Sequence, residues 1–412
     1  MATIVVPINL LHVARVETIS PLDELMHIDY LLRASAPGLQ RMSDVFSQEA
    51  MHEIACRGHP TDRLPPCGRV PYEPAEFSWE GRNLASGHSP YYYTATGVVA
   101  RPLRVLLPGD SLVSWARAIG SAWLLAGLGL ILAAARRLGV NPWAVVPMLI
   151  LLSLSPSTQH AATTVNPDAT AVFAGGLVLL AAVRVIEQSA HWVWGLLAAV
   201  FAVLLDPGNL LIVLAMALFG LTASSTPRRS RLVLALALLG GATVAEVANR
   251  AFVRLLGVVD YAGNPQETLF AVDALTGPMT WGESALFAMV PPTKGYMFPV
   301  LATPAHNVAS TAAILLATVG IVACALAGPQ RAGIDRLAAC GLALLVLGAP
   351  LLIVMRYVLG GSYYSIPPRY GLCMVPILAI AGATILTSRR GGYLLSGGVC
   401  LALASTAIVA LA

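Results

Sequence analysis

A short segment near the start of the chain, Ser20–Tyr30, carries side chains that can move protons. Its sequence, SPLDELMHIDY, sets Asp23 and Glu24 side by side and His27 about one helical turn further on. Carboxylates and imidazoles are the usual general acids and bases of enzymes. The same segment also fits an ordinary helix start, because Ser-Pro followed by acidic residues is typical of a helix N-terminus. Proton-transfer chemistry and a solvated helix cap are therefore both open from this segment alone.

A second candidate group follows later, in HSPYYYTATGVVARPLR. His88 precedes the tyrosines Tyr91–Tyr93, whose rings and hydroxyl groups suit either a sugar ring or a membrane interface. Arg101 and Arg104 begin the stretch 101–117, which has the pattern of an interfacial amphipathic helix. The arginines of such a helix can hold lipid phosphates.

Further candidates stand at the mouths of apolar segments. Asn166 and Asp168, in NPDA, open one such segment, either as an ordinary cap or with Asp168 directed into a cavity. Lys294, the only lysine of the chain, lies in PPTKGY, and Arg369 and Tyr370 follow two prolines. Ammonium and guanidinium groups bind phosphate well. A surface lysine and an arginine that extends to the membrane interface are the alternatives.

The elements that must position these residues are membrane helices. Of the 412 residues 57% are hydrophobic and only 11% are charged, whereas a soluble domain carries about 25% charged residues. An all-α polytopic membrane protein is therefore expected. Apolar runs of helical length cover residues 112–135, 142–156, 167–186, 191–205, 207–223, 231–252, 309–328, 336–358, 370–387 and 392–411. Residues 1–14 are apolar as well, but a span needs roughly 20 residues, so they are expected to form a truncated or short, tilted first helix.

These runs divide the chain into five parts. They are the first helix (1–14), a first outer loop (15–111), a transmembrane bundle (112–253), a second outer loop (254–308) and the C-terminal helices (309–412). Basic residues fall on every second connection, which predicts that these connections are cytoplasmic. The acids of Ser20–Tyr30, His88, Asp168, Lys294 and Arg369 would then all lie on the opposite, outer side. They are expected to converge on one outer cavity.

The cysteines and the absence of nucleotide-binding and zinc-binding motifs limit the kinds of site that the sequence predicts. Cys56 and Cys67 lie eleven residues apart in the first outer loop, where they could form a disulfide or remain thiols. The other four cysteines fall in apolar runs and are expected to behave as small buried side chains. The sequence has no glycine-rich nucleotide loop, no Walker pattern and no zinc-ligand spacing. Nucleotide-dependent chemistry and nucleic-acid binding are therefore not expected.

Taken in order, several motifs resemble those of one enzyme family. PLDELMH, HSPYY, WARAIGS, NPDA and PPRYGLCMVPIL look like the motifs of GT-C type membrane glycosyltransferases. The likeness is greatest to a bacterial multi-spanning branch that is similar to the protein mannosyltransferases and the lipid A aminoarabinose transferase. It extends from about residue 15 to about residue 380. The resemblance implies a GT-C-like bundle of about 10–11 transmembrane helices with interfacial helices in the first outer loop.

The resemblance also implies an activity. Such enzymes move a sugar from a polyprenyl-phosphate donor to an acceptor hydroxyl, with inversion, on the outer face of the bacterial inner membrane. The acceptor would be an envelope glycan, a glycolipid or a protein. Either Asp23 or Glu24 would be the general base. The substrate-binding residues would be His27, His88, Tyr91, Tyr92, Asn166, Asp168, Arg101, Arg104, Lys294, Arg369 and Tyr370. No cofactor is required by the sequence, and a divalent metal stays open.

Other functions fit the same pattern of helices and outer polar residues. A transporter or flippase for a lipid-linked glycan would have an outward polar cavity too, but it should show inverted repeats and helices broken near the midplane. No such repeat is evident in the sequence. A polymerase of envelope glycans and a non-catalytic subunit are further alternatives.

Overall fold

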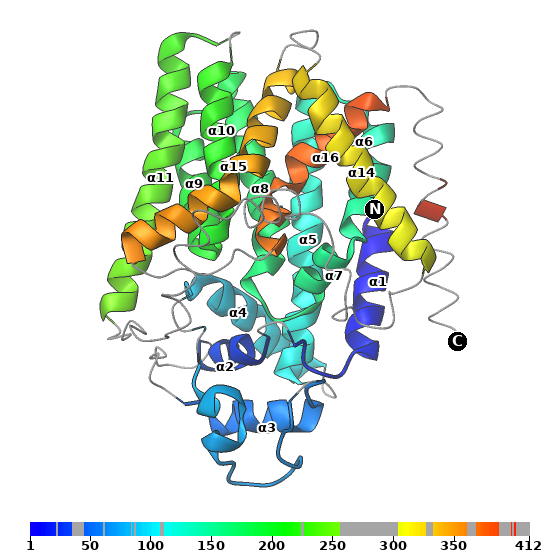
Figure 1. Cartoon of the computed structure of the whole chain (residues 1–412), viewed down its shortest axis with the longest axis vertical. Helices are drawn as coiled ribbons and strands as arrows, with labels where there is room; N and C mark the ends of the chain where they lie inside the picture. Colours follow the sequence, from blue (N-terminus) through cyan, green and yellow to red (C-terminus); the bar gives the residue numbers. More distant parts are fainter. Residues whose placement is uncertain are drawn as a thin grey trace.

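Helices are the regular secondary structure of the part of the chain that the computed structural model describes, apart from one isolated β-bridge between Val45 and Arg82. The structure describes residues 1–21, 24–34, 45–60, 62–83, 85, 88–107, 111–223, 226–255, 304–326, 333–360, 368–386, 397 and 399–400. A bundle of apolar helices forms most of the molecule, and a lobe of shorter polar helices lies at one end of it (Figure 1).

The bundle helices coincide with the predicted apolar runs. They are α1 (Ala2–Arg15), α5 (Leu112–Arg137), α6 (Pro142–Ser153), α8 (Ala171–Ile186), α9 (Val193–Leu205), α10 (Leu210–Thr222), α11 (Arg228–Leu255), α14 (Pro304–Leu326), α15 (Ile334–Gly360) and α16 (Val375–Ile385). Most of the run predicted at 392–411 and most of the second outer loop lie outside the described residues.

Length and composition make this chain a helical membrane protein. Three described segments are long and apolar enough to cross a membrane: Leu112–Arg137, Pro167–Ile186 and Arg228–Phe252. Shorter apolar helices surround them, at Ala2–Arg15, Pro142–Ser153, Val193–Leu205, Pro207–Thr222, Thr311–Leu326 and Arg369–Ile385. Large apolar side chains remain exposed on their outer faces, for example Leu236 on α11 and Leu315 on α14, as expected for surfaces that face lipid.

The connections that carry arginines gather at one end of the bundle. Arg137, at the end of α5, pairs with Glu187 after α8 at 2.7 Å, and Arg336 near the start of α15 donates to the carbonyl oxygen of Thr222 at the end of α10. Exposed Trp143 begins α6 in the same region. Among the described residues, the arginine-bearing connections therefore lie beside one another in two pairs, and the side of a membrane that they face stays a prediction.

At the opposite end, three bundle helices begin with a short 3₁₀ turn. These turns are η4 (Pro167–Thr170), η5 (Pro207–Asn209) and η7 (Pro368–Met374), and they precede α8, α10 and α16. In the first two, the residue before the proline caps the turn with its side chain. Asn166 Oδ1 accepts from the backbone N–H of Asp168 at 2.9 Å, and Asp206 Oδ1 accepts from that of Gly208 at 2.6 Å. Proline then suits the first helical position, where no hydrogen bond is lost.

Two sequence-based expectations were wrong at this end. The connection between the apolar runs 142–156 and 167–186 was expected to be an external turn, but it forms a buried helix, α7 (Pro156–Thr163), followed by η4. Hydrogen bonds compensate for the burial of its polar side chains: Thr158 bonds to Ser155, Thr163 donates to the carbonyl oxygen of Gln159, and the His160 ring bonds to Ser20. The stretch 101–117, expected to be one interfacial helix, belongs to two helices, α4 (Tyr91–Leu106) and α5.

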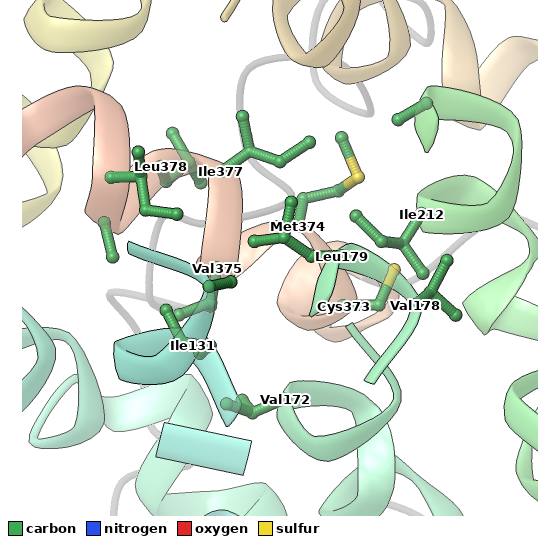
Figure 2. Packing of buried hydrophobic residues seen from close by; sticks show 14 of the residues in the cluster. Ile131, Val172, Val178, Leu179, Ile212, Cys373, Met374, Val375, Ile377 and Leu378 are labelled. Atoms are coloured by element: carbon green, nitrogen blue, oxygen red, sulfur yellow. The ribbon is translucent and has the colours of Figure 1, made fainter. Parts of the chain in front are cut away.

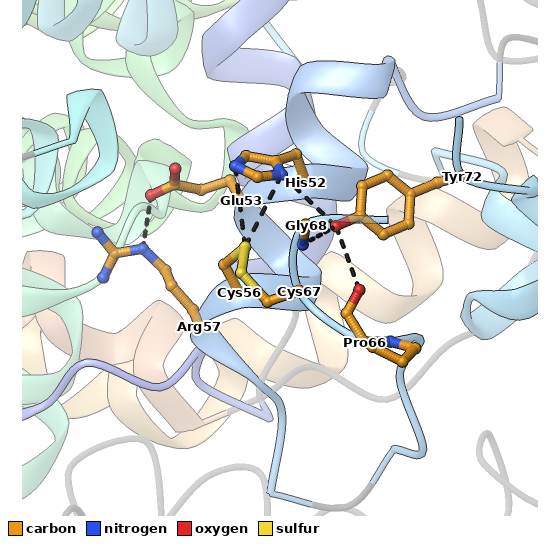
Figure 3. The surroundings of a disulfide bond; sticks show 8 residues. All are labelled: His52, Glu53, Cys56, Arg57, Pro66, Cys67, Gly68 and Tyr72. Carbon is orange, nitrogen blue, oxygen red and sulfur yellow. Dashed lines mark hydrogen bonds and ion pairs between the residues drawn. A yellow bond between two sulfur atoms is a disulfide. The ribbon is translucent and has the colours of Figure 1, made fainter. Parts of the chain in front are cut away.

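The lobe is built from the first polar region and has its own apolar core. It contains α2 (Glu24–Ala34), α3 (Gln48–Arg57), η1 (Pro74–Glu76), η2 (Ser78–Gly81) and α4. Ile28, Phe46 and Tyr72 are among its fully buried side chains. Cys56 and Cys67 form a disulfide that closes the loop after α3, with His52 beside it (Figure 3). Of the two alternatives for these cysteines, the structure has the disulfide.

The core of the bundle forms where α5, α8, α10 and the η7–α16 segment meet. Ile131 of α5, Leu179 of α8, Ile212 of α10 and Met374 of η7 are all buried there, and Cys373 lies among them (Figure 2). Gly127 lets α5 approach α8 so closely that a Cβ atom at this position would lie 2.6 Å from the backbone nitrogen of Phe173. Backbone-to-backbone packing of this kind is typical of small residues in membrane helices.

We expect Gly127→Ala to destabilise the protein by about 1–3 kcal/mol, because backbone atoms of α8 have to shift to admit the new methyl group. Gly129→Ala is the matched control on the same helix, since nothing lies within 4 Å of a Cβ atom there. Thermal unfolding of the purified protein in detergent measures both. Equal unfolding temperatures for the two variants would contradict the close contact of α5 and α8.

Candidate functional site

Five segments that are far apart in the sequence meet where the lobe joins the bundle. They are α2, the start of α4, the α7–η4 segment, η5 and η7, and contacts join them pairwise. This is the convergence that the alternation of basic residues predicted. Asp23 and Lys294, two of the predicted site residues, lie outside the described residues.

Glu24 forms a fully buried ion pair with Arg117 of α5. The two carboxylate oxygens accept from Arg117 Nε at 2.8 Å and from Nη2 at 2.7 Å, and also from the backbone N–H groups of Ser20 and Val165, each at 2.8 Å. Burial by itself would raise the pKa of Glu24, but the charge and hydrogen bonds of Arg117, with the two backbone donors, hold it below its usual value. Glu24 is therefore anionic and fully engaged, which suits an anchor better than a proton acceptor.

The same arginine fixes the end of α1. Arg117 donates from Nη1 to the carbonyl oxygen of Val16 at 2.7 Å and from Nη2 to that of Thr18 at 2.8 Å. Arg117 ends the stretch 101–117, whose arginines were expected to be able to hold lipid phosphates, but its side chain is only 1% exposed. One guanidinium thus joins α1, α2 and α5.

Asp29, the third acidic residue of the segment, is also an anchor. Its Oδ1 accepts from the backbone N–H and the hydroxyl of Ser47, at 2.8 and 3.0 Å, and from Arg33 at 3.2 Å. Its Oδ2 accepts from Asn83 at 2.9 Å. These bonds tie α2 to the start of α3.

His27 belongs to an aromatic cluster formed by α2, α4 and His88, which lies three residues before α4. Its Nδ1 lies 2.6 Å from the Tyr93 hydroxyl, and its ring lies edge-on to that of His88 at 5.3 Å. Tyr30 stacks on Tyr93 at 4.0 Å and donates to the carbonyl oxygen of His88 at 3.0 Å. His27 and His88, which the sequence analysis assigned to one sugar pocket, are indeed neighbours.

The His27–Tyr93 pair is electrically neutral. Burial is the main cause that holds the pKa of His27 well below its usual value, and His88, Arg369 and His160 act in the same direction. Burial likewise raises the pKa of Tyr93. The neutral imidazole can therefore accept a hydrogen bond at Nδ1 from the Tyr93 hydroxyl, which orients both rings without introducing a charge.

A second ion pair lies next to this cluster. Asp168 of η4 and Arg369 of η7 approach to 2.5 Å, with the Asp168 side chain 3% exposed and that of Arg369 17% exposed. The backbone N–H of Asn166 donates to the Tyr92 hydroxyl at 3.1 Å, which brings α4 against η4. Asn166, Asp168, Tyr92 and Arg369 therefore lie together, as predicted.

Tyr370 packs against the η5 turn. A Cβ atom at Gly208 would lie 3.3 Å from the ring of Tyr370, and Asp206 caps this turn. Both tyrosine and turn are close to the Asp168–Arg369 pair, because η7 contacts η4 as well as η5.

Three predicted site residues lie on the surface and away from this cluster. Tyr91 is 49% exposed. Arg101 donates to the carbonyl oxygen of Leu32 at 3.4 Å, and Arg104 lies 3.7 Å from Glu49 on α3. All three project from the exposed sides of α4, whereas Tyr92 and Tyr93 project inward.

His160 also belongs to the site, although no motif in the sequence identified it. His160 Nε2 lies 2.8 Å from the Ser20 hydroxyl, which connects α7 to the segment before α2. A histidine within a polar stretch between two apolar runs was the available signal. Among the described residues, no three His, Cys, Asp or Glu side chains gather as metal ligands would.

No protein-family model matches this chain, and no curated protein matches its sequence significantly. The family resemblance therefore depends on the motifs and their order.

The arrangement offers a neutral, partly aromatic wall beside a carboxylate–guanidinium pair. Tyrosine and histidine rings can stack on a sugar, and Asp168 can accept hydrogen bonds from its hydroxyl groups. Arg369 is the partly exposed member of its pair, so it can share its donors between Asp168 and an incoming phosphate oxygen. Glu24 and Asp29 hold the elements that carry these groups.

We expect Glu24→Gln to destabilise the protein by about 3–5 kcal/mol, because it leaves the Arg117 charge buried without its partner. Glu49→Gln is the matched control. Its ion pair with Arg104 is exposed, and such pairs contribute about 0–1 kcal/mol. Unfolding in detergent compares the two, and equal losses would show that the buried pair is not the anchor.

We expect His27 to make the protein less stable as the pH falls from 7 to 5. The folded-state pKa lies well below 6.5, so protons bind to the unfolded chain first, and stability is lost as the pH falls below about 6.5. In His27→Gln this loss should shrink by about 1 kcal/mol per pH unit. Unfolding temperatures between pH 7 and 5 test it, with exposed His191→Gln as the control. Identical pH profiles of wild type and His27→Gln would contradict the prediction.

Proposed function

We propose that this protein is a GT-C type glycosyltransferase that moves a sugar from a polyprenyl-phosphate donor to an acceptor hydroxyl, with inversion. The observation that carries the proposal is the meeting of His27, His88, Asp168 and Arg369 at one end of an apolar helix bundle. These residues come from the motifs that resemble the family, and their side chains suit a sugar and a phosphate. The bundle is proposed to contain about 10–11 spans in the bacterial inner membrane, with this end outermost.

In this proposal Asp23 is the general base. Glu24, the other candidate, already accepts four hydrogen bonds and pairs with Arg117. The Asp23 carboxylate takes the proton of the acceptor hydroxyl as its oxygen forms a bond to the anomeric carbon. The bond from that carbon to the phosphate oxygen breaks, and the lipid phosphate leaves with the electron pair. Arg369 stabilises the charge that develops on the phosphate, and Lys294 is proposed to assist.

A second candidate function has a separate observation in its favour. The apolar helix α6 ends at Ser153, and the buried polar helix α7 begins at Pro156. The two helices are therefore consecutive segments that are separated by a break at Leu154–Ser155. Broken membrane helices often line the substrate sites of transporters. A transporter for a lipid-linked glycan is therefore the alternative to transfer.

We expect Asp23→Asn to reduce sugar transfer by at least about 100-fold, the usual contribution of a general base. Transfer from a panel of polyprenyl-phosphate sugars by the purified protein measures this. Glu187→Gln, at the far end of α8, is the control and should keep wild-type activity. Glu24 stays intact, because its replacement would disturb the fold.

The outcomes separate the candidate functions. Transfer that Asp23→Asn removes supports the proposed base and identifies the donor. Transfer that survives the substitution keeps the enzyme class but contradicts the role of Asp23. An inactive wild type that moves a lipid-linked glycan across vesicles would replace the proposal with transport.

A further inference from the structure

Helix α1 carries two polar side chains on the face that it turns to the bundle. Its buried residues are Val5, Ile8, Asn9 and His12. This spacing places all four on one side of the helix. Asn9 is 0% exposed, and neither its amide nitrogen nor its carbonyl oxygen has a hydrogen-bond partner within the part of the chain that the structure describes. Because burial of an unbonded amide is unfavourable, Asn9 requires a polar partner inside the bundle.

Helix α5 contributes a further polar group from the facing side. α1 and α5 are in contact, and the carbonyl oxygen of Val16, just after α1, accepts from Arg117 near the start of α5 at 2.7 Å. The two helices therefore run antiparallel, as Figure 1 shows. Ser121 lies one helical turn after Arg117, and His12 lies one turn before Val16, at about the same depth in the bundle. Ser121 is 2% exposed, and its hydroxyl has no partner among the described residues.

Helix α7 is the third helix at this depth. It contacts α1 and α5, and its C-terminal end is at the lobe, where Val165 donates to Glu24. A Cβ atom at Gly120 would lie 2.2 Å from the carbonyl oxygen of Ala162, so Gln159 lies about one turn deeper in the bundle than this contact. Gln159 donates from Nε2 to a carbonyl oxygen at the end of α6, but its buried Oε1 has no partner in the described parts of the chain.

The polar groups of the three helices are neutral and include both donors and acceptors. Asn9 has an amide nitrogen and a carbonyl oxygen to satisfy, Ser121 has a hydroxyl and Gln159 has a carbonyl oxygen. Apolar side chains such as Ile8 and Leu124 belong to the surrounding core. Buried water bonds to about three such polar groups, whereas an ion would require a counter-charge in these apolar surroundings.

We infer that Asn9, Ser121 and Gln159 bind ordered water inside the bundle, between α1, α5 and α7. The water donates to the carbonyl and hydroxyl oxygens and accepts from the Asn9 amide, which satisfies polar groups that the fold buries. The site starts one helical turn from Arg117 and extends the polar region of the lobe end into the bundle. The attachment of α1 is thereby partly hydrated. This water site goes beyond glycosyl transfer and does not depend on it, because none of its contacts involves a substrate.

X-ray footprinting of the full chain in lipid nanodiscs tests for this water. A short X-ray pulse generates hydroxyl radicals from water, bound water included, and the radicals oxidise the side chains beside it. Mass spectrometry then measures the oxidation rate of each residue. Leu124, which is 1% exposed and lies about one turn after Ser121, is the reporter at the site. Leu179 and Leu238, both 0% exposed in the apolar core, are controls matched in residue type and burial.

We expect Leu124 to be oxidised several-fold faster than Leu179 and Leu238. In the double variant Asn9→Leu/Ser121→Ala its rate should fall to theirs, because the apolar replacements leave the water without partners. A wild-type rate at Leu124 no higher than at the controls would overturn the inference, since the site would then be dry. A high rate that is unchanged in the double variant would overturn it as well, because it would reflect transient opening of the bundle to bulk water.

Unfolding temperatures in detergent check that the double variant folds. Ser121→Ala alone, which removes only a hydroxyl, decides the test if Asn9→Leu does not fold. It should lower the Leu124 rate in part, and an unchanged rate would overturn the inference. Thr243→Ala is the matched control, because it removes an exposed hydroxyl of α11, and it should leave the Leu124 rate as in the wild type.

Discussion

The architecture of the lobe end depends on one buried charge pair. Arg117 and Glu24 are both almost completely excluded from water, and a charge in that position is costly unless its hydrogen bonds are satisfied. They are satisfied by a carboxylate, by the end of α1 and by the segment after α7. The pair can therefore exist only when α1, α2, α5 and the α7–η4 segment have all reached their places. This requirement specifies how the first polar region joins the bundle.

The helices of the bundle were largely predictable, because a membrane span is a local property of the sequence. The apolar runs were sufficient to predict the described helices α5, α6 and α8 to α11. The burial of α7 was not predictable in this way. Its serines, threonines and histidine look like a solvated turn until the partners within the bundle are known.

The roles of the acidic residues in Ser20–Tyr30 were likewise not predictable from the sequence. The sequence identified Glu24 and Asp29 as chemically notable, but it could not show that one would meet Arg117, 93 residues away, and the other Ser47 and Asn83. Because the acidic residues of Ser20–Tyr30 are close together in the sequence, one shared function was expected for them. Glu24 and Asp29 instead bind residues that are distant in the sequence and hold the elements together. The convergence of His27, His88, Asp168 and Arg369 was predictable only as a common side of the membrane.

The glycines of the bundle have a mechanical consequence for the site. A Cβ atom at Gly120 of α5 would lie 2.2 Å from the carbonyl oxygen of Ala162 in α7, and one at Gly175 of α8 would lie 2.2 Å from that of Cys373 in η7. The elements that carry His160, Asp168 and Arg369 thus pack backbone against backbone and form the rigid part of the site. Helices α2 and α4 contact this rigid part through side chains such as those of Glu24 and Tyr92. Any widening of the site for a bulky ligand must therefore come from displacement of α2 or α4.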